Sequence, residues 1–373
     1  MGGPHLTFSD SASFICNVCG AVCPRPPEPP GRETAGCACN STVRLRSLVA
    51  LLSNEVFGVP LALPDFPAMK GLRGFGMSDP PNLARQLEKK FDYTNTFYHQ
   101  PPTIDITQPA DTEWGRYDFI VSSEVMEHVP PPVESAFANL YRLLKPNGVL
   151  LLTVPYGINM PPKEHFPEMH QYALAAVGGK TMLVNRRRDG ATEVFEDLCF
   201  HGGDGSTLEL RVFTEETLTS ILLGAGFSEV RIASENIPEF GVDHAETWSL
   251  PLVARKGKLQ PSITEVARAY ADALRHSAEV EQELGRIQAE YDRHIAFHKQ
   301  SHQEMTDALA ARTEWAQRQE AIAKERTEWA HSLDKDYKQL LAHLEHVKAE
   351  AQSAADAMEA RRWVRLGRKL GLL

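Results

Sequence analysis

The fold is decided by the stretch YDFIVSSEVMEHV, which spans residues 117–129. Residues 119–121 form an apolar run typical of a buried parallel strand, and polar residues follow at once, where α/β sheets place their ligands. Further on, the sequence predicts a helix over 132–144, a turn at the Lys-Pro-Asn-Gly of 145–148 and a second buried strand over 149–154. This strand–helix–strand unit predicts an α/β domain.

Composition divides the chain around this unit. Its 373 residues carry a net charge of -10, with 42% hydrophobic and 24% charged residues, which are ordinary globular values. The sequence has no apolar run near the ~18 residues of a membrane helix, and its acidic balance argues against nucleic-acid binding. We therefore expect a soluble, cytoplasmic protein with a cysteine-rich module (1–60), an α/β domain (61–258) and a helical segment (259–373).

Five of the six cysteines lie within the first 39 residues. Cys16-x-x-Cys19-Gly is half of a zinc-ribbon knuckle, and Cys37-x-Cys39 stands where the second half is expected. These four thiolates predict a structural zinc site, since a complete thiolate set leaves no open position for water. Cys23 is an alternative ligand, and a metal-free knuckle is the other interpretation.

The segment after Pro261 has no proline, and its apolar residues recur in steps of three and four, from Ile263 to Tyr291 and from Leu333 to Ala351. This period predicts a coiled coil or an antiparallel hairpin of helices, through which we expect a homo-oligomer to form. A single solvated helix is the alternative. The string RTEWA occurs at 312–316 and again at 326–330, two heptads apart, which places both tryptophans on one stripe.

The last residues, 361–373, interleave five cations with a tryptophan and four leucines. Such a basic amphipathic segment predicts peripheral contact with an anionic membrane surface or with a partner. A frayed basic helix end is the alternative.

The phrases YDFIVSSEVMEHV and LLKPNGVLLLTVPY resemble the fourth and fifth strands of class I S-adenosylmethionine-dependent methyltransferases. Residues 213–232 resemble the last helix and following strand of that family. The segments GLRGFGMSD, KFDYTNTFYHQPPTIDIT and EHFPEMHQY are similar to a bacterial subset with an N-terminal cysteine motif. The resemblance implies a Rossmann-like fold, S-adenosylmethionine as cofactor and an EC 2.1.1 enzyme that O-methylates a sugar or polysaccharide intermediate.

The resemblance also implies cofactor-binding positions. The glycine-rich turn corresponds to 72–79, where a serine replaces the third glycine and Leu72 stands in place of the usual acid. For the ribose, Asn95 is favoured over Asp92, and the adenine is expected beside Asp105 and the Ile106 backbone. The implied cofactor-binding set is Gly74, Gly76, Ser78, Asn95, Asp105, Ile106, Ser123 and Glu124.

A hydroxyl acceptor needs a base that removes its proton. We expect this base to come from the proline-interrupted loop after the fifth strand, and His165 is the predicted catalytic residue. His128, His170 and His201 are its competitors.

Two other classes of function remain open from the sequence. A non-catalytic coiled-coil scaffold with a degenerate cofactor turn agrees with the departures at Leu72 and Ser78. A nicotinamide-dependent oxidoreductase is disfavoured, because Asp79 stands where the third glycine of that motif belongs.

Overall fold

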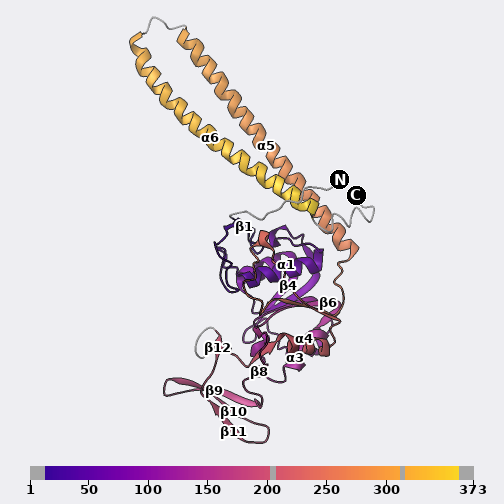
Figure 1. Cartoon of the computed structure of the whole chain (residues 1–373). Helices are drawn as coiled ribbons and strands as arrows, with labels where there is room; N and C mark the ends of the chain where they lie inside the picture. The colour runs from indigo at the N-terminus through magenta and orange to yellow at the C-terminus, as the bar shows by residue number, and fades with distance from the viewer. Residues whose placement is uncertain (1–12, 202–206, 311–315, 361–373) are drawn as a thin grey trace. The chain divides into compact units, whose positions relative to one another are not determined.

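The computed structural model describes residues 13–201, 207–310 and 316–360 (Figure 1). It divides into two compact units, residues 1–266 and 267–373, which are described separately. Residues 13–60 belong to the same unit as the α/β sheet.

A six-stranded sheet, ordered β15-β16-β6-β5-β3-β4, forms the centre of the first unit. Its strands are β3 (Met69–Met77), β4 (Phe91–Thr96), β5 (Tyr117–Ser123), β6 (Leu144–Thr153), β15 (Glu229–Ile232) and β16 (Leu252–Arg255). The first four are parallel, whereas β16 and β15 join antiparallel at the β6 edge. The predicted Rossmann-like α/β fold is therefore confirmed.

Helices pack against this sheet. Ile120, Leu150 and Leu152 are fully buried in a core shared with α3 (Val133–Leu143) and α4 (Glu215–Ala225). Helix α2 (Pro81–Lys90) leads from β3 into β4, and α1 (Val43–Phe57) packs against β6. Short 3-10 turns occur at η1 (Leu63–Asp65), η2 (Asp111–Glu113), η3 (Met126–His128) and η4 (Pro238–Phe240).

The predicted helix over 132–144 agrees with α3, but the turn predicted at 145–148 is wrong. Strand β6 begins at Leu144, directly after the helix, and residues 145–148 form an irregularity within it. Tyr117 pairs with Leu144 and Phe119 with Val149, so four residues of β6 lie opposite one of β5. Lys145 Nζ contacts Asp118 Oδ2 at 2.6 Å and holds the irregularity to the neighbouring strand.

A β-rich insertion follows β6 and packs around its own apolar cluster of Phe166, Met169, Leu183, Leu208 and Leu210. Its three-stranded antiparallel sheet consists of β9 (Gln171–Val177), β10 (Lys180–Arg186) and β11 (Thr192–Phe195). The short strands around it are β7 (Tyr156–Gly157), β8 (Lys163–Glu164), β12 (Phe200–His201), β13 (Thr207–Leu208) and β14 (Arg211–Thr214). The N-terminal hairpin consists of β1 (Ser13–Ile15) and β2 (Val22–Pro24).

The second unit is a pair of long helices, α5 (Ile263–Ala310, whose first turn lies in the first unit) and α6 (Ala316–Ala360). They run antiparallel: the Tyr291 and Tyr337 rings lie 5.9 Å apart, and those of His298 and Trp329 lie 6.1 Å apart. The sequence predicted a coiled coil or an antiparallel hairpin of helices, and the structure shows the antiparallel hairpin. Most of the first copy of the RTEWA repeat, with its tryptophan, and the basic tail of 361–373 lie outside the described residues.

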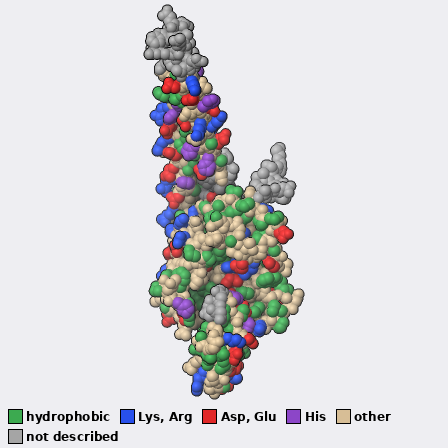
Figure 2. Space-filling view, turned by 90° about the vertical axis from the view of Figure 1, so that its left-hand side faces the viewer, with side chains coloured by type: hydrophobic (Ala, Val, Ile, Leu, Met, Phe, Trp, Pro, Cys, Tyr) green, Lys and Arg blue, Asp and Glu red, His purple; other side chains and the backbone are tan. Residues whose placement is uncertain are grey.

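The surface of this helix pair is strongly charged. Figure 2 shows cations and anions interspersed along it, with several histidines among them. Among the described residues, no helix is long and apolar enough to cross a membrane.

Candidate active site and cysteine cluster

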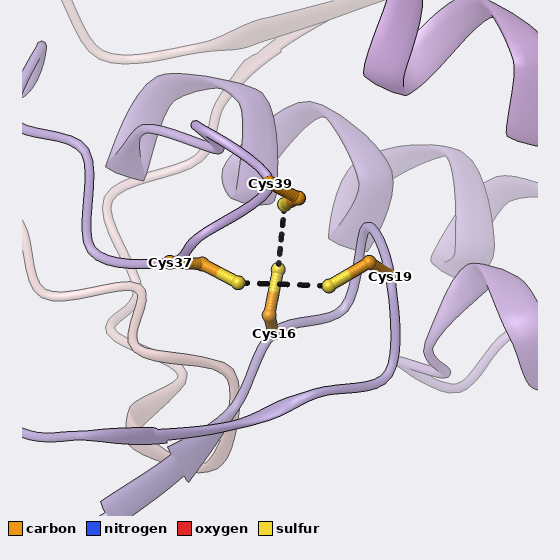
Figure 3. Close-up of side chains that lie close together, drawn as sticks. All are labelled: Cys16, Cys19, Cys37 and Cys39. Carbon is orange, nitrogen blue, oxygen red and sulfur yellow. Dashed lines mark hydrogen bonds between the residues drawn. The ribbon is translucent and has the colours of Figure 1, made fainter.

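The four cysteines predicted to bind metal converge in the structure (Figure 3). Cys16 Sγ lies 3.7 Å from Cys39 Sγ, and Cys19 Sγ lies 3.5 Å from Cys37 Sγ. The first knuckle closes when Gly20 N donates to the Cys16 carbonyl at 2.7 Å, at a φ of +82° that favours glycine. The Cys-x-Cys half therefore brings its thiols to the same point despite its missing spacer residue.

This geometry fits a tetrahedral metal. Zn–S bonds of about 2.3 Å place thiolates about 3.8 Å apart, close to the distances above. Burial alone would raise the pKa of Cys37, but hydrogen bonds from the Cys39 backbone and from neighbouring thiols, Cys23 first among them, lower it to about 7. Cys23 is buried and outside the four-thiol group, and its Sγ approaches the Ala21 carbonyl at 3.6 Å.

Two arginines connect the cysteine module to the carboxyl end of β5. Arg32 binds Glu124 in bidentate fashion, with Nη1–Oε2 at 3.0 Å and Nη2–Oε1 at 2.5 Å. Arg44 donates to Ser123 Oγ and to Glu33 Oε1, the latter at 2.7 Å. Ser123 and Glu124 thus both contact a cation from the cysteine module.

The glycine-rich turn after β3 is built around a buried aspartate that the sequence analysis did not select. Asp79 accepts a hydrogen bond from Tyr93 Oη, and Asn95 clamps its backbone, accepting from Asp79 N and donating to Asp79 O, both at 2.9 Å. A Cβ at Gly76 would lie 1.8 Å from Asp79 Oδ2 and 2.0 Å from Tyr93 Oη, so only glycine fits. Burial raises the pKa of Asp79 to about 6 despite the Tyr93 hydrogen bond.

The predicted residues Gly74, Gly76, Ser78 and Asn95 are therefore neighbours, at the carboxyl ends of β3 and β4. Ser78 adopts a φ of +60°, and its N–H donates to the Thr96 carbonyl at 2.7 Å. Asn95 lies nearer the end of β4 than Asp92, as expected, but its side chain holds the turn.

Asp105 and Ile106 lie in the loop between β4 and β5. Asp105 Oδ1 accepts from the N–H and the hydroxyl of Thr107, at 2.8 and 2.6 Å, which is a local turn contact. The Ile106 carbonyl accepts from Asn139 at 3.0 Å. Asp105 thus has the turn contacts of an ordinary loop aspartate.

The carboxyl ends of β3 and β5 fit a polar ligand such as S-adenosylmethionine. Asp79 Oδ1 and Ser122 Oγ are both buried and accept or donate no hydrogen bond within the described residues. Buried polar atoms without partners are costly, so a ligand that pairs with them is favoured. Gly74, Gly76 and Ser123 lie on the same strands.

His165, the predicted base, is linked to a second histidine through one carboxylate. His165 Nε2 lies 3.1 Å from Glu209 Oε1, and His201 Nε2 lies 2.9 Å from Glu209 Oε2. Glu127 and His128 follow β5 directly, and Glu127 Oε1 lies 3.9 Å from His201 Nδ1. Three of the four histidines considered from the sequence thus gather beside the end of β5.

Glu127 and Glu209 are the members of this cluster that sequence reasoning missed. Burial, reinforced by the charge of Glu124, raises the pKa of Glu127 to about 8. A signal for Glu127 was present, because an acid next to a histidine just past a strand end is a site pattern. For Glu209, within an alternating Leu-Glu-Leu-Arg run, the sequence carried no signal.

A buried arginine fixes this cluster. Arg211 donates to the carbonyls of Met126 and Val129, at 3.0 and 2.5 Å, and to Glu164 Oε1 at 2.7 Å. The segment after β5 is thereby tied to β8, next to His165. The cluster is held by the fold rather than by a free loop.

An open groove of about 510 Å³ adjoins His165. Its lining is mostly polar: Lys163, His165, Gly179, Lys180, Thr181, Glu196, Asp197, Leu198, Cys199 and Phe200. All of these residues belong to the β-rich insertion, which also carries His165, so an acceptor bound in the groove would meet the predicted base.

Comparisons with known proteins agree with this fold. A family model described as a methyltransferase domain matches residues 70–231. A ubiquinone biosynthesis O-methyltransferase of Acinetobacter baylyi is 31% identical over 111 residues, which are 30% of this chain and 41% of that protein. The chain thus spans less than half the length of this curated relative.

Solved structures of methyltransferases are also similar. The sugar N-methyltransferase KedS8 of Streptoalloteichus is 12% identical, with a TM-score of 0.32 over 56% of this chain and 84% of that one. The 1,6-didemethyltoxoflavin-N1-methyltransferase of Burkholderia thailandensis is 16% identical, with a TM-score of 0.31 over 57% of this chain and 77% of that one.

The sheet and the matched segment define the class of protein. This chain carries a class I S-adenosylmethionine-dependent methyltransferase domain, as the resemblance of its strand phrases predicted.

Proposed function

We propose that the protein transfers a methyl group from S-adenosylmethionine to a hydroxyl of a sugar or polysaccharide intermediate. The observation that carries this proposal is the link between the segment after β5 and His165: Leu210 N donates to the Glu127 carbonyl and His165 N donates to the Leu210 carbonyl, both at 2.9 Å. His165 is in turn paired with Glu209 at 3.1 Å and lines a polar groove. Polyhydroxylated acceptors suit a groove lined by charged and hydroxyl groups.

S-adenosylmethionine, when bound, supplies a methyl group already activated on a sulfonium. The chain's own residues then have two tasks, to align the acceptor and to take its proton. Glycines 74 and 76 allow the β3 turn to form, and Ser123 and Glu124 border the cofactor with Arg32 and Arg44 behind them. His165 accepts the acceptor's proton, and Glu209 orients its ring and stabilises the imidazolium that results.

Calorimetric titration of the purified chain with S-adenosylmethionine and S-adenosylhomocysteine tests the cofactor half of this proposal. We expect micromolar affinity. Absence of binding at millimolar ligand, in folded protein, would instead support the alternative of a non-catalytic scaffold. In that case the contacts of Arg32 and Arg44 with Glu124 and Ser123 would be structural only.

Turnover against a panel of sugar, polysaccharide and small phenolic acceptors tests the acceptor half. Methylation of phenols alone would contradict the glycan assignment while leaving the transferase intact.

We further propose that the four-cysteine cluster binds structural zinc. Its role would be to fix the turn from which Arg32 and Arg44 extend toward β5. We also propose a cytoplasmic location, because a cysteine cluster that binds metal rather than forming disulfides is typical of a reducing compartment.

The helix pair is proposed to tether or oligomerise the enzyme. Mixed charges on its surface and the ring contacts between α5 and α6 support a solvent-exposed rod of two helices. Light scattering of the full chain tests self-association, and co-sedimentation with anionic vesicles, with and without residues 361–373, tests the predicted membrane contact of the tail.

A further inference from the structure

Three side chains outside the cysteine cluster converge just past the end of β5. Glu127 Oε1 lies 3.6 Å from His128 Nε2 and 3.9 Å from His201 Nδ1, and the three ligand atoms all lie within 4.8 Å of one another. Ligands of a first-row metal ion, at bond lengths of about 2.1 Å, lie about 3 Å apart. We propose that Glu127, His128 and His201 bind a divalent transition-metal ion.

The carboxylate of Glu127 is the strongest argument for a cation. Its side chain is fully buried, and neither oxygen accepts a hydrogen bond from another described residue. A buried carboxylate without a partner is costly, and a bound cation would remove that cost. Among the described residues, no lysine or arginine donates a hydrogen bond to these oxygens, and the charge of Arg32 acts on Glu127 only from farther away.

Both histidines have the ring orientation of metal ligands. His128 Nδ1 lies 2.8 Å from the Leu208 carbonyl, and because a carbonyl only accepts, Nδ1 carries the proton. His201 Nε2 donates in the same way to Glu209 Oε2 at 2.9 Å. In each ring the other nitrogen is the one that faces Glu127, so a hydrogen-bonded nitrogen lies opposite the nitrogen that would bind the ion, as in metal-bound imidazole.

The backbone holds these ligands in place before any ion binds. The Glu127 carbonyl accepts from Leu210 N at 2.9 Å, and Arg211 fixes the preceding Met126 carbonyl at 3.0 Å. Rigid placement of this kind lowers the cost of assembling a coordination sphere.

Two imidazoles and one carboxylate favour Zn²⁺, Fe²⁺ or Mn²⁺, and they leave positions open for an exogenous oxygen. This part of the inference rests on the proposed function. A cation here would coordinate the acceptor hydroxyl and lower its pKa. The O–CH₃ bond would then form as the S–CH₃ bond breaks, the sulfonium becoming a neutral thioether, and the hydroxyl proton would pass to His165.

Titration with Mn²⁺ tests the site without turnover. Mn²⁺ prefers oxygen and nitrogen ligands, so it leaves a four-thiolate zinc site loaded. We expect the zinc-loaded full-length chain to bind one equivalent of Mn²⁺, measured by loss of the free-ion electron paramagnetic resonance signal. Glu127→Gln, which keeps the side-chain shape, and His201→Ala should each weaken this binding at least tenfold.

Cys199→Ser is the matched control, because Cys199 forms another three-residue group with His201 and Glu209. We expect it to bind Mn²⁺ as the wild type does, and a loss equal to that of Glu127→Gln would overturn the ligand set. Wild-type affinity in Glu127→Gln, or no Mn²⁺ binding and a single zinc per wild-type chain, would overturn the site itself. S-adenosylmethionine titration of the same samples reports separately on the proposed function.

Discussion

Arg32 and Glu124 form a bidentate ion pair, with N–O distances of 3.0 and 2.5 Å, across 92 residues of sequence. Burial alone would raise the pKa of Glu124, but the hydrogen bonds and charge of Arg32 hold it below its ordinary value. The pair fastens the cysteine module to the strand end that faces the proposed cofactor. Zinc binding and cofactor binding are therefore expected to be coupled through it.

We expect Arg32→Gln to weaken S-adenosylmethionine binding at least tenfold and to lower the free energy of unfolding by about 1–2 kcal/mol. This loss of unfolding free energy is smaller than for a fully buried ion pair, because both side chains are partly exposed. Calorimetry and urea unfolding at pH 7 measure the two effects. Arg25→Gln, which breaks the partly exposed pair with Asp243, is the matched control and should keep cofactor affinity.

The stability loss in Arg32→Gln should depend on pH. The pKa of Glu124 is lower in the folded than in the unfolded chain, so the pair stabilises the fold above the unfolded pKa and loses this contribution as pH falls through the folded one. The difference between variant and wild type should thus shrink in acid. A difference that stays constant down to pH 3 would assign the effect to packing.

Asp79→Asn is expected to stabilise the protein at neutral pH. The pKa of Asp79 is raised to about 6, so the folded state favours the neutral carboxyl, and its contribution to stability declines as pH rises from about 4 to 6. Asparagine still accepts from Tyr93, and the gain above pH 6 is on the order of 3 kcal/mol at most. Urea unfolding at pH 4 and pH 8 should show the gain only at pH 8.

Gly76→Ala should lower both stability and cofactor affinity, because its Cβ would collide with Asp79 and Tyr93. We expect about 2–4 kcal/mol of destabilisation, which is typical of an overpacked backbone. Gly224→Ala in α4 is the control, since nothing lies within 4 Å of its Cβ. It should be neutral or stabilise by about 0.5–1 kcal/mol, as alanine does in helices.

Much of the fold followed from local pattern. The apolar run ending in Ser123-Glu124 and the apolar run through Thr153 each indicated a buried parallel strand. The period after Pro261 indicated long helices, and only the structure distinguishes the hairpin from the other arrangements. Residues 145–148 did not follow, because a Lys-Pro-Asn-Gly turn signal is also compatible with an irregular strand start in which four residues lie opposite one residue of the neighbouring strand. That choice depends on tertiary pairing.

The site could be predicted only where the residues that act together lie close to one another in the sequence. Cys16 and Cys19 define a knuckle by spacing alone, and Gly74 with Gly76 define a turn. Asp79 and Tyr93 meet across 14 residues, and Glu209 reaches His165 from a strand that only the insertion's fold brings near. Such contacts are set by packing, which a single sequence does not display.

Cys16→Ser with Cys37→Ser should remove the zinc. We expect the wild type to retain one zinc that this double variant lacks, with a lower unfolding temperature and weaker S-adenosylmethionine binding, since structural zinc contributes directly to folding. Metal analysis and thermal unfolding measure this. Cys23→Ala tests the alternative ligand: it should keep the zinc, and loss of zinc there would place Cys23 in the coordination set.

His165→Ala should lower the turnover number at least 100-fold, which is the lower range for removal of a general base, and leave S-adenosylmethionine affinity within twofold. The reason is its position: it adjoins the groove and is oriented by Glu209, but it contacts none of the proposed cofactor residues. His170→Ala removes an exposed histidine of the same loop and should keep turnover. Because a structural role would reduce stability as well as rate, the unfolding temperature of both variants is measured alongside. If the turnover of His165→Ala stays within twofold of the wild type, the base that accepts the proton is instead His128 or His201, the other histidines of the cluster.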